Sequence, residues 1–279
     1  MILRLNDHGD SVKRLQRNLN KLGSVLLVDG DFGPGTRTAV ITARANVAVA
    51  GAGPVGNVGD ADEALQTALT ALRDPFPPLL RAPGGTFIAR LEIGSPRQYT
   101  SMYRHPVWPS EDSGITIGIG YDLKFVTRTQ FEADWSGVLS APDIGRLAAA
   151  FGVTGSNQLR QTVVDLDFPL DVAMKVFRDR TLPEFISKTR SIYPQLDSLS
   201  PERATALVSL VYNRGASLDG DRRREMRAIQ TLLASDDQDA VAAEFDAMER
   251  LWEPTSGLVK RRHDEARLWR SGFAALQLD

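Results

Sequence analysis

The first part of the chain has apolar residues at the spacing of α-helices. After Asp10 they recur every three or four residues, at Val12, Leu15, Leu19 and Leu22. This pattern predicts a helix capped by Asp10. A second helix is expected from Thr36 to about Asn46, and a third is expected to begin at Asp60, where a capping box starts. Three short helices predict a small bundle that occupies residues 1–74.

A segment rich in proline and glycine follows this bundle. Residues 75–85 contain Pro75, Pro77, Pro78, Pro83, Gly84 and Gly85. Proline lacks the backbone N–H that a helix interior needs, so this composition favours an extended spacer. The sequence therefore predicts a linker over residues 75–85 and a second domain over residues 86–279.

The second domain opens with a short apolar-periodic segment that ends in an acidic residue. Thr86 is a suitable N-cap for it and Gly94 a suitable terminator. The pattern predicts a helix that begins after Thr86 and carries Glu92 on its last turn.

Alternation of large and small residues marks the next element. Ile115, Ile117, Ile119 and Tyr121 would share one face of a strand. On the other face, Thr116 and Asp122 would lie roughly 20 Å apart if the strand were straight, at about 3.3 Å per residue. Gly118 and Gly120 tolerate positive φ, so a hairpin is expected there instead.

Such a hairpin would bring Thr116 and Asp122 together, opposite the carboxyl of Glu92. A carboxyl that faces a hydroxyl and a second carboxylate across a cleft is the equipment of glycoside hydrolysis. The alternative is a buried hairpin with an unrelated surface glutamate. Residue spacing by itself supports the two interpretations about equally.

Helical patterns dominate the rest of the chain. Helix starts are expected at Thr127, Ser140 and Ser200, and a long helical run after Pro169 is expected to break at residues 181–183. Three more amphipathic helices are expected over residues 221–234, 237–250 and 257–270. The predicted class is α+β, mostly α, with one small sheet.

Composition narrows the chemistry. A length of 279 residues suggests two domains. The chain is 42% hydrophobic and 24% charged, and its net charge of −2 gives no electrostatic argument for nucleic-acid binding. There is no cysteine, and the three histidines are far apart, so neither a thiol nucleophile nor a zinc site is expected. We expect no metal, no cofactor, no membrane insertion and a monomer.

Four motifs in the second domain occur in the order found in phage-type lysozymes, glycoside hydrolase family 24. They are Glu92, the stretch Gly114 to Leu123, the helix end at Asn213-Arg214-Gly215, and the segment Gly257 to Glu265. The Tyr-Asp-Leu end of the second motif resembles the pesticin-like branch. Each motif is weak alone, but four in order within a predicted domain of about 195 residues are fairly specific.

This resemblance implies a lysozyme-like fold and cleavage of the β-1,4 bond between N-acetylmuramic acid and N-acetylglucosamine. Glu92 would be the general acid, Asp122 the base or electrostatic partner, and Thr116 the residue that holds the attacking water. Substrate contacts are expected from Tyr121, Asn213 and Tyr103. Stereochemistry stays open because it depends on the carboxyl separation.

The second carboxylate has competitors. Many phage-type lysozymes carry it about six residues before the threonine, where this chain has Ser110. Glu111 and Asp112 lie close to that place but out of register. Asp122 follows Thr116 by six residues, which is the pesticin-like arrangement, and its alternative role is to accept backbone N–H bonds at the end of the hairpin.

The N-terminal bundle resembles the peptidoglycan-binding domain 1 family. The matching pieces are Gly9-Asp10, the repeat from Val12 to Leu19, Gly23, the turn from Asp29 to Thr36, and Ala39-Val40. The resemblance implies that Asp29 and Phe32 contact glycan, although a turn former and a core residue fit the same positions. After Val40 the match is poor and residues 47–59 are glycine-rich, so the binding surface is open to question.

Together these motifs predict an endolysin, a peptidoglycan hydrolase with peptidoglycan as its partner. The alternatives are a chitinase-like glycosidase and a non-catalytic wall-binding protein with a degenerate lysozyme domain. No signal peptide is recognisable, so the expectation is synthesis in the cytoplasm of a bacterial host and action on periplasmic peptidoglycan. A secreted effector and a bacteriocin fit the same features.

Overall fold

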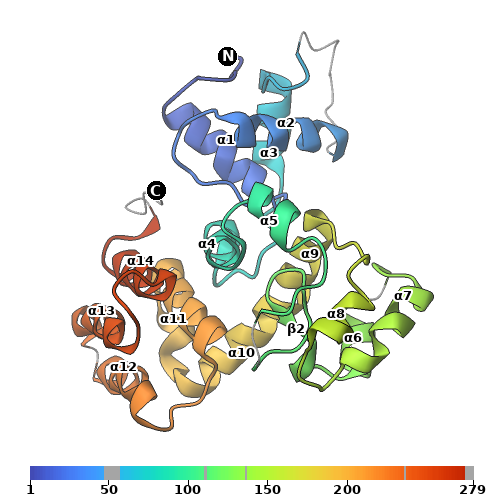
Figure 1. Cartoon of the computed structure of the whole chain (residues 1–279). Helices are drawn as coiled ribbons and strands as arrows, with labels where there is room; N and C mark the ends of the chain where they lie inside the picture. The colour runs from blue at the N-terminus through green and yellow to red at the C-terminus, as the bar shows by residue number, and fades with distance from the viewer. Residues whose placement is uncertain (47–56, 110–111, 136, 236, 274–279) are drawn as a thin grey trace.

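The computed structural model describes residues 1–46, 57–109, 112–135, 137–235 and 237–273. Helices dominate this part of the chain (Figure 1). Its one sheet is the antiparallel pair of β1 (Thr116–Ile117) and β2 (Tyr121–Asp122). The expectation of a mostly helical chain with one small sheet is confirmed in the described residues. None of the helices described there is long and apolar enough to cross a bilayer.

The N-terminal bundle has the three predicted helices, α1 (Asp10–Asn20), α2 (Pro34–Asn46) and α3 (Glu63–Ala71). Its core contains Leu3, Val12, Leu15, Leu19, Leu26, Phe32, Ala39, Val40, Ala43, Ala61, Leu65 and Leu69. Two details correct the sequence reading. Leu22 is 37% exposed and lies outside this core, and the N-cap of α3 is Asp62 rather than Asp60. The carboxylate of Asp62 accepts the Leu65 N–H at 2.8 Å, which satisfies a free donor of the first turn.

The segment predicted as an extended linker is partly helical. Helix α4 covers Arg81–Ile93, so it starts six residues before the predicted start and passes through the Pro-Gly-Gly sequence. A Cβ at Gly84 would lie 2.2 Å from Oγ1 of Thr205, and one at Gly85 would lie 2.2 Å from Cδ1 of Phe76. These glycines therefore allow close packing. Thr86, expected to be the cap, is buried inside the helix.

Residues just before α4 also belong to the second domain. Phe76 and Leu80 are buried in its larger core. The carboxylate of Asp74 accepts the N–H groups of Phe76 at 3.0 Å and Ala82 at 2.8 Å, which fixes this turn. A fragment that begins at Gly84 would lose these contacts, so the second domain needs residues from about Asp74 onward.

The N-terminal bundle packs against the second domain. Val25, in the loop after α1, is fully buried in the core of the second domain although it adopts a positive φ of 52°. Its carbonyl accepts a bond from Nη1 of Arg90 on α4 at 3.2 Å. Such a φ is unfavourable for a β-branched residue, so burial of the valine side chain must offset it.

The second domain has two hydrophobic cores. The larger gathers residues from α4 and from the helices between α9 and α14; the smaller gathers residues from the hairpin and from the segment between α6 and α9. Figure 1 shows α9 and α10 running between these two regions. The remaining helices are α5 (Pro96–Met102), α6 (Arg128–Asp134), α7 (Ala141–Arg146), α8 (Asn157–Gln161), α9 (Leu170–Val176), α10 (Leu182–Ile192), α11 (Pro201–Arg214), α12 (Arg224–Ala234), α13 (Gln238–Ala247) and α14 (Gly257–Ser271).

Most predicted helix starts are confirmed. The hydroxyls of Thr127, Ser140 and Ser200 cap α6, α7 and α11 through backbone N–H groups three residues later. The expected break near Thr181 is not an interruption of the helix. A π-helical turn over Phe177–Thr181 joins α9 to α10, so the helix continues to Pro183 and beyond.

The close crossing of α4 and α11 leads to a prediction about Gly84. Gly84→Ala should lower the free energy of unfolding by about 1–3 kcal/mol, because the new methyl overlaps the Thr205 side chain. Chemical denaturation measures this. Gly145→Ala in α7 is the matched control, since a Cβ there meets nothing within 4 Å. Equal stabilities of the two variants would contradict the packing argument.

Candidate functional site

Glu92 lies where the sequence predicts, on the last turn of α4. Gly94 closes the helix with a φ of 68°, and its N–H bonds to the Arg90 carbonyl. The Glu92 side chain is 20% exposed, and its Oε1 accepts from Nη1 of Arg261 at 2.6 Å. The carboxylate is thus held by a buried cation while part of it stays open to solvent.

The predicted hairpin is confirmed, and its tip meets Glu92. Gly118 and Gly120 have φ values of 56° and 66°, which L side chains rarely adopt. A Cβ at Gly120 would lie 3.5 Å from Oε2 of Glu92. The hydroxyl of Tyr212, on α11, donates to the Ile119 carbonyl at 2.8 Å. Ile119 belongs to the larger core, unlike its neighbours Ile117 and Tyr121, so the turn carries the chain from one core to the other.

Thr116 and Asp122 are paired across the hairpin, as predicted. Within the described residues, the Thr116 hydroxyl has no hydrogen-bond partner, whereas its backbone pairs with Val107. The Asp122 carboxylate accepts N–H groups from Gly114, at 3.0 and 3.2 Å, and from Lys124 at 2.9 Å. The structural role foreseen as the alternative for Asp122 is therefore present.

Arg261 is the centre of a buried network that reaches beyond Glu92. Its Nη2 donates to the carbonyl and hydroxyl oxygens of Ser209 at 3.0 and 3.1 Å, and its Nε donates to Glu265 at 3.3 Å. The pair with Glu265 joins residues four apart on one helix face, whereas the bond to Glu92 joins two distant helices. Burial alone would lower the pKa of Arg261, but the charges of Glu92 and Glu265 raise it above its ordinary value.

The next arginine completes this network at the end of α11. Arg262 is fully buried and donates from Nη2 to Glu265 at 3.1 Å and to Oδ1 of Asn213 at 3.3 Å. Burial lowers the pKa of Arg262 to about 10, although the charge of Glu265 opposes the shift. Its Nε and Nη1 have no hydrogen-bond partner among the described residues. Asn213, expected to bind substrate, is thus engaged in fixing this arginine.

Tyr212 adds a neutral donor beside Glu92. Burial, and then the negative charge of Glu92, raise its pKa well above the usual tyrosine value. Its hydroxyl therefore stays protonated and keeps its bond to the Ile119 carbonyl. Sequence reasoning missed Tyr212 and the Arg261–Glu92 pair. For Tyr212 the sequence offered only its place near the end of an apolar helix. For the pair, 169 positions separate Glu92 from Arg261, so no local pattern connects them.

Two tyrosines expected to contact substrate are placed differently from one another. Tyr121 is 8% exposed within the smaller core, packs edge-on against Trp135, and donates its hydroxyl to Asp134 at 2.7 Å. Burial and that bond raise its pKa. This corrects the expectation for Tyr121, whose ring is covered by its own core. Tyr103 is partly buried against the larger core and follows the last turn of α5.

The competing carboxylates near the hairpin are only partly described. Asp112 is exposed, and its carbonyl accepts Nζ of Lys124 at 2.7 Å. Glu111 and Ser110 lie outside the described residues. The choice between Asp122 and these residues stays a prediction.

In the N-terminal bundle, the two residues expected to bind glycan have structural roles. Phe32 is 1% exposed and belongs to the core, which corrects its assignment to a binding surface. Oδ1 of Asp29 accepts the Asp31 N–H at 2.8 Å and Nε2 of Gln16 at 2.7 Å, so Asp29 shapes the turn. Sequence reasoning had left both alternatives open.

Part of this bundle matches a known protein family. Residues 8–43 match the family described as a putative peptidoglycan binding domain. No curated protein matches the chain. The match supports a peptidoglycan-binding module and peptidoglycan as a partner. It covers α1 and most of α2, including the turn that Asp29 holds.

The network around Arg261 predicts a large loss of stability when the cation is removed. Arg261→Met leaves Glu265, whose side chain is fully buried, with a weaker set of partners. Breaking a buried pair on one side costs about 3–5 kcal/mol, which chemical denaturation would detect. The control is Arg270→Met on the same helix, whose ion pair with Asp246 is about half exposed and should matter by less than about 1 kcal/mol. Similar losses for both variants would rule out the special role of Arg261.

Proposed function

We propose that the protein is an endolysin-like peptidoglycan hydrolase that cleaves the β-1,4 bond between N-acetylmuramic acid and N-acetylglucosamine. The observation that carries the proposal is the meeting of the hairpin tip with Glu92. A Cβ at Gly120 would lie in van der Waals contact with the Glu92 carboxyl, 3.5 Å from Oε2, and only 3.0 Å from the Tyr212 hydroxyl. A glycine turn against a partly exposed glutamate leaves room for a sugar chain beside an acid.

Glu92 is the general acid in this mechanism. It gives a proton to the glycosidic oxygen as the bond to the leaving sugar breaks. Arg261 fixes one carboxyl oxygen, Oε1, while Oε2 is the oxygen near the hairpin. This orientation directs one oxygen of the carboxyl toward the substrate side.

Thr116 and Asp122 supply the water-activating side of the proposal. The Thr116 hydroxyl holds the attacking water by a hydrogen bond, and Asp122 acts as base or as electrostatic partner. The backbone N–H groups of Gly114 and Lys124 donate to the Asp122 carboxylate and orient it.

The N-terminal module complements this activity. A peptidoglycan-binding bundle in the same chain raises the concentration of the second domain at the wall. Val25 packs into the second domain and bonds to Arg90 on α4, so the two domains are in direct contact rather than joined only by a flexible linker. A chitinase-like substrate has no comparable support.

One observation favours a second candidate, a wall-binding protein without catalysis. The Asp122 carboxylate accepts backbone N–H groups from both sides of the hairpin, as it would if it only closed the hairpin. Product analysis on purified sacculi separates the two candidates. New reducing sugar ends are expected from the hydrolase and none from the binding protein.

Replacement of the acid tests the role of Glu92. Glu92→Gln keeps the size of the side chain but removes the transferable proton. Lysis of permeabilised Gram-negative cells should fall by at least about a hundredfold, the scale of losing a general acid. The control is Glu132→Gln, an exposed residue paired with Arg128 on α6, which should stay active. Near wild-type lysis by Glu92→Gln would refute the assignment.

The choice of second carboxylate is tested by a pair of asparagine variants. Asp122→Asn should lose more than tenfold of the activity on sacculi, whereas Asp112→Asn should stay within about tenfold, equal to about 1.4 kcal/mol in barrier. Because Asp122 also holds backbone N–H groups, the unfolding midpoint of each variant must be measured beside its activity. An inactive Asp112 variant beside an active Asp122 variant would reverse the assignment.

A further inference from the structure

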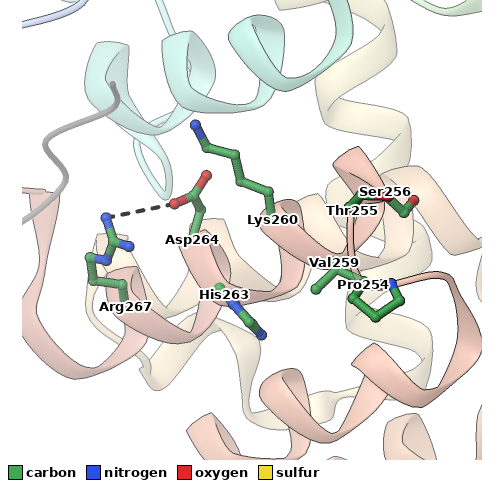
Figure 2. A pocket seen from close by; sticks show the side chains of 8 residues that line it. All are labelled: Pro254, Thr255, Ser256, Val259, Lys260, His263, Asp264 and Arg267. Atoms are coloured by element: carbon green, nitrogen blue, oxygen red, sulfur yellow. Dashed lines mark ion pairs between the residues drawn. The ribbon is translucent and has the colours of Figure 1, made fainter.

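A pocket of about 280 Å³ lies along α14, outside the residues assigned to the reaction (Figure 2). Its lining comes from the first turns of α14 and the residues just before them, and consists of Pro254, Thr255, Ser256, Val259, Lys260, His263, Asp264 and Arg267. Its volume is near the lower end of small-molecule sites, enough for a single amino-acid-sized group. The pocket begins beside the N-terminus of a 15-residue helix, where a helix dipole favours negative charge.

The charges around this pocket are mixed. Lys260 and Arg267 supply two cations, and Asp264 supplies one carboxylate. His263 pairs with Glu249, which is not part of the lining, at 3.3 Å. An anionic group at the pocket would meet these two cations and, beside them, a carboxylate.

Asp264 is the unusual member of this set. Its side chain is only 4% exposed, and its partner is Nη1 of Arg267 at 3.8 Å, which is longer than a hydrogen bond. Burial raises the pKa of Asp264, although the charges of Arg267 and Lys260 oppose the shift. A buried carboxylate with so weak a partner is costly, and a positively charged donor from a ligand would offset that cost.

Side chains in Figure 2 are arranged to receive both charges of one small group. Lys260 and Asp264 point to the same side of α14, and the Arg267 guanidinium reaches toward Asp264. The ammonium of such a group would meet the carboxylate of Asp264, and its carboxylate would meet the cations of Lys260 and Arg267 in the same pocket. A simple inorganic anion would meet the repulsion of Asp264.

We propose that this pocket binds the zwitterionic amino-acid end of a peptidoglycan stem peptide, with its ammonium on Asp264 and its carboxylate on Lys260 and Arg267. The proposal rests on the proposed function, because it takes the wall as substrate. It extends that function by giving the second domain a contact with the peptide, next to residues that fix the sugar-cleaving acid. Arg261, which bonds Glu92, directly follows Lys260 in the chain.

The experiment uses the full-length Glu92→Gln protein, so that binding is measured without turnover. The probe is N-acetyl-L-Ala-γ-D-Glu-meso-diaminopimelate, whose distal end is a free zwitterion. The matched probe has that distal amine acetylated. Titration calorimetry should show binding of the first probe and at least about tenfold weaker binding of the second. Equal affinities, or no binding of either probe, would overturn the proposal.

Variants identify the groups that bind the probe. Asp264→Asn should weaken the zwitterionic probe at least about tenfold and leave the acetylated probe unchanged, whereas Lys260→Met should weaken both. The control is Arg270→Met on the last turn of α14, outside the lining, which should bind like the parent. If Asp264→Asn fails to fold, the comparison of the two probes on the parent protein still decides the role of the ammonium. Inorganic phosphate that competes as strongly as the zwitterionic probe would show a plain anion site and refute the proposal.

This design separates the pocket from the hydrolase assignment. Cleavage of sacculi by the wild type without binding of the probe would reject the pocket alone. Specific binding of the zwitterionic probe by a protein that releases no reducing sugar ends would reject the hydrolase alone.

Discussion

The ion pair between Arg261 and Glu92 is the interaction on which the second domain depends most. It joins α14 to α4 across 169 positions of sequence. Arg261 also donates hydrogen bonds to the buried residues Ser209 and Glu265. Arg261 is 95% buried by side chain, so its charge would be costly without Glu92 and Glu265. The same bond that makes a buried cation tolerable also fixes the carboxyl that the proposed reaction needs. Stability and function therefore depend on one group.

A second constraint is the close approach of backbone segments at three glycines. Gly84 lets α4 cross α11 at Thr205, and Gly120 lets the hairpin tip approach Glu92. Gly118 turns the chain beneath Trp135 of the smaller core, where a Cβ would lie 3.1 Å from its ring. The tip is also held by Tyr212 from α11. Consequently the larger core positions the glutamate and Ile119 at the hairpin tip, although most of the hairpin belongs to the smaller core.

The sequence predicted local structure well where the signal was local. Caps at Thr127, Ser140 and Ser200, the terminator Gly94, and the turn at Gly118 and Gly120 each depend on a few neighbouring residues. It failed at Gly84 and Gly85, because glycine and proline usually interrupt helices, whereas here tertiary contacts with Thr205 and Phe76 select them. Packing partners far apart in sequence leave no periodic signal.

The candidate site divides in the same way. Glu92 and the Thr116–Asp122 pairing followed from spacing, yet Arg261, Tyr212 and the contact of Val25 with the second domain did not. Tyr121 and Phe32 show the opposite error. An aromatic beside a motif suggested ligand contact, but burial gives a large ring more stabilisation than a wet surface does.

Asp122 has a role in the hairpin as well as a proposed role in the reaction. Its carboxylate closes the hairpin by accepting N–H groups from both sides, from Gly114 before β1 and from Lys124 after β2. Those bonds set the register that pairs it with Thr116, and the register sets the turn that carries Gly120 to Glu92. Replacing Asp122 thus disturbs the site even if the carboxylate never touches water or sugar. A role in the reaction is then distinguished from a role in the hairpin only by a loss of activity that exceeds the loss of stability.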